Sequence, residues 1–337
     1  MGLRSTLRRW RHSHGPPELL LRRALRDLVA GDDEAAEERL LGLVKHHTEE
    51  VDAYLALAEI FRRRGEVGRA IALYQNLNLR NDLDTEQRVT VLIGLGRAFE
   101  TGGYGPRAIA TFEQVLERES DDPAALDGLA RLLPEHGDYE RALVIERRRA
   151  KLRGSRDRES EGALLTAIAR ARLAEGRDDV AHHAARRALK ADFGQVDALL
   201  VMAEIDANAK RPKRVVGHLV KALDTDPGRA AEILPRLELA WPDGAGRRGD
   251  WLDFLRDAAK RHADERALVD ALARALAERE QTDEALEVLQ AGLVRWPADD
   301  ALRMRQGRIL LDRGRYDDAL TAYESMLDLL EKRREDE

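Results

Sequence analysis

The sequence predicts an all-α fold in which about nine helix–turn–helix units stack into a right-handed superhelical solenoid. Three observations lead to this prediction. A turn residue is followed five positions later by a small residue, and this pair recurs every 31–39 residues. A further small residue stands seven positions before most of these turns. Aromatic residues make up only 4% of the chain and charged residues 36%, which suits a thin two-layer array with a large surface.

The stretch Leu95–Phe112, LGRAFETGGYGPRAIATF, shows one unit most clearly. Gly96 is small enough for another helix to lie against it, and Gly103 can adopt the positive φ that ends a helix. Ala108 and Phe112 are four residues apart and therefore share one face of the next helix. This order of residues is typical of the tetratricopeptide repeat, a helix–turn–helix unit of about 34 residues.

The same spacing extends along most of the chain. The predicted turn residues are Gly31, Gly65, Gly103, Gly137, Gly176, Lys210, Gly249, Glu280 and Gly314. The residues five positions after them, in the same order, are Ala36, Ala70, Ala108, Ala142, Ala181, Val215, Phe254, Ala285 and Ala319. The predicted packing residues of the first helices are Ala24, Ala58, Gly96, Ala130, Ala169, Ala203, Ala273 and Gly307, with Pro242 at this position in the seventh unit. Because Pro242 and Trp251 break the pattern, we expect the seventh unit to be degenerate.

The solenoid is expected to occupy residues 18–330, between two short charged ends. Residues 1–17 form a basic arm with four arginines around Trp10, which we predict to be disordered; contact with an anionic membrane surface is the alternative. The start, MGLRST, also matches the N-myristoylation pattern, which is short enough to arise by accident. Residues 242–249 contain three glycines and are predicted to form an irregular joint. Residues 331–337 are predicted to be a solvated, charged tail.

Composition argues against several classes of function. The net charge of −6 disfavours general nucleic-acid binding. The absence of cysteine excludes disulfides, zinc ribbons and iron–sulfur clusters. No stretch of the sequence has the roughly 18–20 apolar residues needed to cross a bilayer, and there is no apolar signal-peptide core. We therefore expect a cytoplasmic chain.

Candidate chemical groups are few. His46–His47 and His182–His183 are adjacent pairs, and neighbouring helix residues point about 100° apart, which is poor geometry for sharing a metal ion. The sequence contains no phosphate-binding loop, no GxGxxG after a strand and no GxSxG nucleophile turn. We predict a protein that is not an enzyme and has no cofactor and no metal site.

The position after each packing residue should face the inner, concave surface of the solenoid. Its occupants are Glu59, Arg97, Arg131, Arg170, Glu204, Arg274 and Arg308. Three of these arginines come from consecutive units, and a row of guanidinium groups suits acidic peptides or a carboxylate terminus. The alternative is that the arginines form ordinary pairs within their own helices. The pairs available for this are Arg97–Glu100, Arg131–Glu135, Arg274–Glu278 and Arg308–Asp312, whereas Arg170 has none.

Several stretches go beyond a generic repeat: RRRGEVGRAIALYQNL (62–77), LDTEQRVTVLIGLGRAFETGGYGPRAIATF (83–112) and HGDYERALVIERRRAKL (136–152). With Trp251, Phe254 and the run LVRWP (293–297), they resemble the lipopolysaccharide assembly protein B family over most of residues 22–330. The resemblance implies a repeat array tethered to the bacterial inner membrane, acting as an adaptor between an envelope-lipid biosynthetic enzyme and a membrane protease. It also implies a transmembrane helix and a four-cysteine, rubredoxin-like ribbon, for which this sequence has neither the apolar run nor the cysteines.

From these observations we predict a non-catalytic adaptor that binds proteins or peptides along an arginine-bearing concave face. The resemblance implies that the partners are a membrane protease or an envelope-lipid enzyme, in a protein that is cytoplasmic and peripheral at the inner membrane. The alternative is a generic tetratricopeptide chaperone or assembly scaffold with unrelated clients. An enzyme or a ligand-binding receptor has no support in the sequence.

Overall fold

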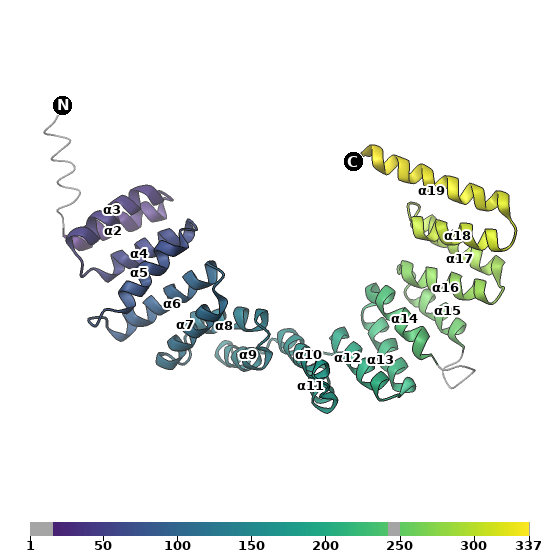
Figure 1. Cartoon of the computed structure of the whole chain (residues 1–337), viewed down its shortest axis with the longest axis horizontal. Coiled ribbons are helices and arrows are strands. Elements are labelled where there is room, and N and C mark those ends of the chain that lie inside the picture. The colour runs from purple at the N-terminus through teal and green to yellow at the C-terminus, as the bar shows by residue number, and fades with distance from the viewer. Residues whose placement is uncertain (1–15, 242–249, 337) are drawn as a thin grey trace. The chain divides into compact units, whose positions relative to one another are not determined.

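The computed structural model describes residues 16–241 and 250–336, from residue 328 onward by backbone alone, and these residues form tandem pairs of antiparallel helices (Figure 1). The first helices of the pairs are α2 (Pro17–Val29), α4 (Val51–Arg63), α6 (Thr85–Thr101), α8 (Pro123–Glu135), α10 (Arg158–Ala174), α12 (Val196–Asn208), α14 (Ala230–Ala240), α16 (Arg266–Glu278) and α18 (Asp300–Asp312). The second helices are α3 (Asp33–His46), α5 (Val67–Asn78), α7 (Gly105–Arg118), α9 (Tyr139–Arg153), α11 (Asp178–Ala191), α13 (Pro212–Thr225), α15 (Trp251–Arg261), α17 (Thr282–Arg295) and α19 (Tyr316–Asp336). A short 3₁₀ helix, η1 (Pro227–Arg229), precedes α14. The prediction of an all-α helix-pair solenoid is confirmed.

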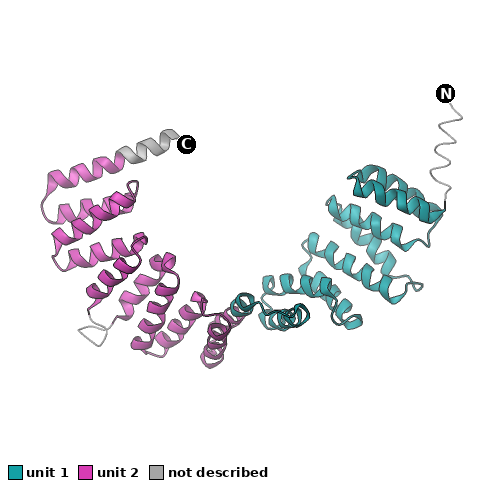
Figure 2. Cartoon of the chain, turned by 180° about the vertical axis from the view of Figure 1, so that it is seen from behind, with its two compact units in different colours: residues 1–164 teal, residues 165–337 magenta. Residues whose placement is uncertain are grey.

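The chain divides into two compact units, residues 1–164 and 165–337, and the boundary falls within α10 (Figure 2). Some predicted features lie outside the described residues. These are residues 1–15 of the basic arm, the joint at 242–249 with Pro242 and Gly249, and residue 337. The backbone of 331–336 continues α19 without a break.

The turn between the two helices of each pair has a backbone conformation that ends the first helix. All eight described turn positions have positive φ, six of them at glycine and two at Lys210 (55°) and Glu280 (62°). The residue after the turn donates its N–H to a carbonyl five residues earlier, as Tyr104 does to Phe99 over 2.8 Å. This closes the helix end in the manner of a Schellman motif. The turn register that the spacing predicts is therefore visible in the backbone.

Small residues of the first helices lie where helices come close together. Most of the predicted packing positions are buried, and Ala130 is partly buried. The ring of Phe112 from α7 is fully buried between α6 and α8. A Cβ atom added at Gly96 would lie 2.7 Å from this ring, and one at Gly128 would lie 2.5 Å from it. The two glycines therefore make room for one aromatic side chain that connects consecutive repeats.

The residues five positions after the turns lie in the first half of each second helix, and the alanines among them are all buried. At most 1% of the residue surface is exposed at Ala36, Ala70, Ala108, Ala142, Ala181, Ala285 and Ala319. Val215, at this position in the sixth repeat, is also buried. Phe254 in the degenerate seventh repeat is only half-buried, so the rule of a small, fully enclosed residue fails there. A small side chain at this position lets the second helix pack closely against its own first helix.

Successive first helices contact one another in both units. In unit 1, α2 contacts α4, α4 contacts α6, and α6 contacts α8; in unit 2, α14 contacts α16, and α16 contacts α18. Most second helices before the last pack between their own first helix and the next one, as α7 does with α6 and α8. Within each unit the first helices therefore form a common face. We call this surface the first-helix face.

An aromatic cluster marks the irregular seventh pair. Trp241 follows the end of α14, and Trp251 and Phe254 lie in the first turn of α15. The ring centroids of Trp241 and Phe254 are 4.8 Å apart, and those of Trp251 and Phe254 are 5.5 Å apart. Because aromatic pairs at these distances add to the free energy of burial, the cluster holds α14 and α15 together where the repeat pattern fails.

Candidate protein-binding face

In unit 1 the predicted inner positions lie on α4, α6 and α8. Glu59 binds Arg62 of its own helix through two hydrogen bonds of 2.6 and 2.8 Å. Arg131 reaches back to Glu100 of the preceding repeat, 2.9 Å away, although Glu135 is available on its own helix. Arg97 is exposed and has no ion-pair partner among the described side chains.

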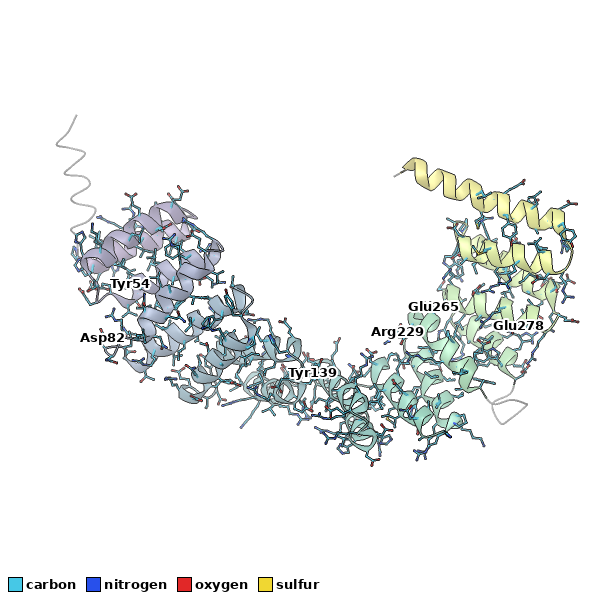
Figure 3. The ribbon with its side chains drawn as sticks, viewed as in Figure 1. Tyr54, Asp82, Tyr139, Arg229, Glu265 and Glu278 are labelled. Carbon is cyan, nitrogen blue, oxygen red and sulfur yellow. The ribbon has the colours of Figure 1, made fainter. Side chains whose placement is uncertain are left out.

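In unit 2 the corresponding charges form a network across three repeats. Arg170 of α10 pairs with Asp197 of α12, so the arginine without a partner in its own helix finds one in the next repeat. Asp197 also accepts from Arg229 of η1 at 3.0 Å, and Arg229, labelled in Figure 3, binds Glu232 at 2.6 Å. Glu232 in turn lies 3.4 Å from Arg236 of α14.

The last two predicted arginines behave differently from each other. Arg274 of α16 pairs with Glu238 of α14, although the sequence suggested Glu278, which Figure 3 labels. Arg308 of α18 is exposed and has no ion pair among the side chains that the structure describes. Arg131, Arg170 and Arg274 therefore connect neighbouring repeats. For Arg131 and Arg274, the sequence suggested ion pairs within a single helix, but in the structure both pair with a carboxylate of another repeat.

The repeat-signature alanines of the second helices take no part in this face. They belong to the helix interfaces, where their burial leaves no surface for a partner to touch: Ala70, Ala108, Ala142, Ala181, Ala285 and Ala319. Their role is to set the distance between the two helices of a repeat. The predicted inner positions depend on this packing, because it fixes which side of each first helix is left open.

The ion pairs of the face limit what an acidic partner can gain at the arginines. The side chain of Arg131 is 57% exposed and that of Arg170 is 56% exposed, so their pairs lie in water and are worth roughly 0–1 kcal/mol each. A partner's carboxylate would have to replace an existing one. Arginines alone are therefore a modest source of affinity on this face.

An apolar groove opens on unit 2 beside one of the predicted inner positions. Its volume is about 450 Å³, and it lies between α12, α13 and α14. Leu200, Val215 and Leu219 are buried and form its floor, whereas Leu239 is 91% exposed at its edge. Glu204, predicted to face inward, lies in the wall of the groove. A hollow of this kind can take a large apolar side chain.

Charged side chains surround this groove. Among the described residues, Lys210, Arg211 and Arg236 are the cations of its lining, and Glu204 is the one carboxylate. Two of these cations are partly engaged, because the guanidinium of Arg211 lies 3.3 Å from the buried Asp206 and that of Arg236 lies 3.4 Å from Glu232. The groove therefore combines an apolar floor with a rim that favours negative charge.

The groove was not predicted from the sequence. Two signals could have indicated it: Lys210 stands at a turn position where six other described repeats have glycine, and Leu239 is apolar at the end of a short helix in the degenerate unit. Neither signal shows which side chains meet. Their proximity depends on how α14 packs against α12 and α13.

The described part of the chain offers little for catalysis or metal binding. Within it, no three His, Asp or Glu side chains are grouped so that they could hold a metal ion. Among the helices in the described ranges, none has both the length and the apolar character needed to span a bilayer.

Comparison with known families identifies the class. Models of the tetratricopeptide repeat match residues 53–86, 93–155 and 271–333. These ranges lie in both units and coincide with the helix pairs described above. The chain therefore contains tetratricopeptide repeats in both of its units.

Among curated proteins, the chain is similar to lipopolysaccharide assembly protein B of Escherichia coli K12, with 26% identity over 245 residues, which is 71% of this chain. The chain spans 63% of the length of that relative. The protein of the same name from Haemophilus influenzae is 28% identical over 102 residues, 30% of this chain and 26% of the relative. The structure of the C-terminal part of a tetratricopeptide-repeat protein from Cytophaga hutchinsonii matches 66% of this chain and 88% of its own, with 16% identity and a TM-score of 0.47.

Proposed function

We propose that this protein is a non-catalytic scaffold that binds an extended segment of a partner protein along its first-helix face. On unit 2 the segment places an apolar side chain in the groove between α12, α13 and α14. Carboxylates next to that side chain pair with Lys210 and Arg236 on the rim. The observation that best supports the proposal is the combination of an apolar floor and a cationic rim in one groove.

The groove and the arginines have different roles in this proposal. Burying one leucine-sized side chain contributes roughly 1.5–3 kcal/mol, more than an exposed ion pair usually does. The apolar contact therefore supplies affinity, and the surrounding charges select and orient an acidic segment. Unit 1 has its own candidate contact for a carboxylate, because Arg97 is exposed and has no ion pair among the described side chains.

A peptide titration tests this proposal. The probe is a fluorescent peptide with Leu-Asp-Asp at its centre, compared with an Ala-Asp-Asp peptide by fluorescence anisotropy. We expect the leucine peptide to bind roughly tenfold more tightly, because a buried leucine contributes more than an alanine. Ala207→Trp fills the groove from an exposed position on α12 and should abolish this preference.

The matched control for this variant is Ala110→Trp, which adds the same side chain at an exposed position on α7 in unit 1. It should leave peptide binding as in the wild type. Equal binding of both peptides, or equal effects of the two tryptophan variants, would rule out the groove as the binding site.

We also propose that the partner belongs to bacterial envelope assembly. The similarity to lipopolysaccharide assembly protein B supports this, and the family resemblance points to an envelope-lipid enzyme or a membrane protease as the partner. A photo-crosslinking residue at position 207, used in the native host, should capture such a protein. Capture of chaperone clients with no envelope role would instead favour the generic scaffold.

A further inference from the structure

A second hollow of unit 2 lies on the second helices, α11 and α13. Its volume is about 550 Å³, within the range of small-molecule sites. Its lining contains His182 and Arg186 from α11, Lys213, Arg214 and His218 from α13, and Met202 and Asp206 from α12. It is separate from the groove on the first-helix face, and nothing in the proposed partner binding uses it.

Described carboxylates neutralise only part of the positive charge in this pocket. Arg186 and Lys213 are exposed and form no ion pair within the described side chains. Among the described residues, Asp206 is the only carboxylate in the lining. Its side chain is 2% exposed, and it already contacts Arg211 at 3.3 Å and His218 at 3.2 Å. Arg214 is 3.9 Å from the same carboxylate and leaves most of its guanidinium directed at solvent, being 64% exposed. Cations therefore outnumber the available negative charge.

The surrounding surfaces of the two helices extend this charge. Further exposed cations on α11 and α13 are Arg187, Lys190 and Lys221. The acidic residues of these helices, Asp178, Asp179 and Asp224, lie near helix ends and outside the pocket lining. Such a concentration of positive charge is unusual in a protein whose net charge is −6. It contrasts with the first-helix face, where most of the predicted arginines are paired with carboxylates.

We propose that this pocket between α11 and α13 binds the phosphate group of a small phosphorylated molecule. Two guanidinium groups from facing helices and one lysine match a phosphate dianion, because arginine binds phosphate oxygens through paired N–H groups. His182 adds a ring nitrogen that can donate a hydrogen bond, whereas His218 already contacts the carboxylate of Asp206 through Nε2. The pocket is concave, so a compact ligand can contact the cations of both helices at once.

The probe for the test is pyrophosphate, titrated by calorimetry at constant ionic strength. We expect Arg186→Ala/Arg214→Ala to weaken binding about 100-fold, roughly tenfold for each charged hydrogen-bonding group removed. The matched control is Lys260→Ala/Arg313→Ala, which removes two exposed cations of unit 2 outside the pocket and should bind as the wild type does. Thermal melting of both variants, expected to match the wild type, establishes that each is folded.

Three results would overturn the proposal. The first is wild-type protein that binds no pyrophosphate at millimolar concentration. The second is equal weakening in both double variants, which would indicate a diffuse charge effect. The third is that the protein binds vesicles of phosphatidic acid but not vesicles of phosphatidylcholine, and that excess pyrophosphate does not displace it from them. This result would assign the basic surface to a membrane.

Discussion

The Nε2 atom of His218 lies 3.2 Å from a carboxylate oxygen of Asp206. In the sequence, Asp206 is four residues before the turn residue Lys210, and His218 is eight residues after it. Asp27 and Arg39 hold the same two positions around Gly31 in the first repeat and also form a pair. The second repeat has Phe61 at the first of these positions, where it is buried in the core. These two positions therefore hold a polar pair in the first and sixth repeats, whereas the second repeat has a buried aromatic ring at the first of them.

The buried pair in the sixth repeat should make stability depend on pH. Burial lowers the pKa of His218 below its ordinary value of 6.5, although the charge of Asp206 acts in the opposite direction. His182 and Arg214, which also face the ring, favour the neutral form too. Well above pH 6.5 the ring is neutral in both the folded and the unfolded chain, so it causes no pH dependence there.

As the pH falls below 6.5, the unfolded chain binds a proton at His218 before the folded chain does, so the free energy of unfolding should decrease. The decrease should end below the pKa of the folded state. His218→Gln should remove this part of the pH dependence in urea unfolding measured between about pH 5 and 7. If the free energy of unfolding of this variant changed with pH as steeply as that of the wild type, His218 would not be the source of the pH dependence. NMR titration of the histidine ring measures the pKa directly.

Gly96→Ala should destabilise unit 1 by roughly 1–3 kcal/mol, because the new methyl group would meet the ring of Phe112 at 2.7 Å. The measurement is thermal unfolding followed by circular dichroism. Gly68→Ala is the control: nothing lies within 4 Å of its Cβ position, and alanine favours a helix, so this variant should be as stable as the wild type or more so. If both variants unfold at the same temperature, the ring of Phe112 does not pack closely against Gly96.

Glu280→Gly should stabilise unit 2. Glu280 has a φ of 62°, a conformation that costs a residue with a Cβ atom about 1–2 kcal/mol, and glycine avoids most of this cost. Allowing for the greater freedom of glycine in the unfolded chain, the net gain should be up to about 1 kcal/mol. Glu287→Gly within α17 should instead lose about 1 kcal/mol, which separates the effect of the turn from that of glycine itself. Chemical denaturation measures both.

Arg131→Ala should lower stability by no more than about 1 kcal/mol, because its pair with Glu100 is largely in water. The coupling between the two residues should appear in a double-mutant cycle with Glu100→Ala and shrink at high salt. Arg97→Ala, which breaks no ion pair among the described side chains, should leave stability unchanged. A coupling energy of zero at low salt would mean that Arg131 and Glu100 do not pair in solution.

The sequence by itself was sufficient to predict the helix pairs, because their determinants are local. A turn needs positive φ at one residue, as at Gly103, and close helix contacts need small residues at fixed distances from it, as at Gly96 and Ala108. These requirements recur in most repeats and are therefore visible as a period. Even Lys210 and Glu280 were placed at turns from this spacing, and both have positive φ.

Only the tertiary structure decided which charges meet. Arg131 and Glu135 are close in sequence, yet Arg131 pairs with Glu100 of the preceding repeat, because the offset between stacked helices brings that carboxylate nearer to it. The groove beside Glu204 likewise depends on the packing of α14 against α12 and α13. Contacts between repeats depend on helix offset and side-chain direction, neither of which is encoded in the spacing of residues along one helix.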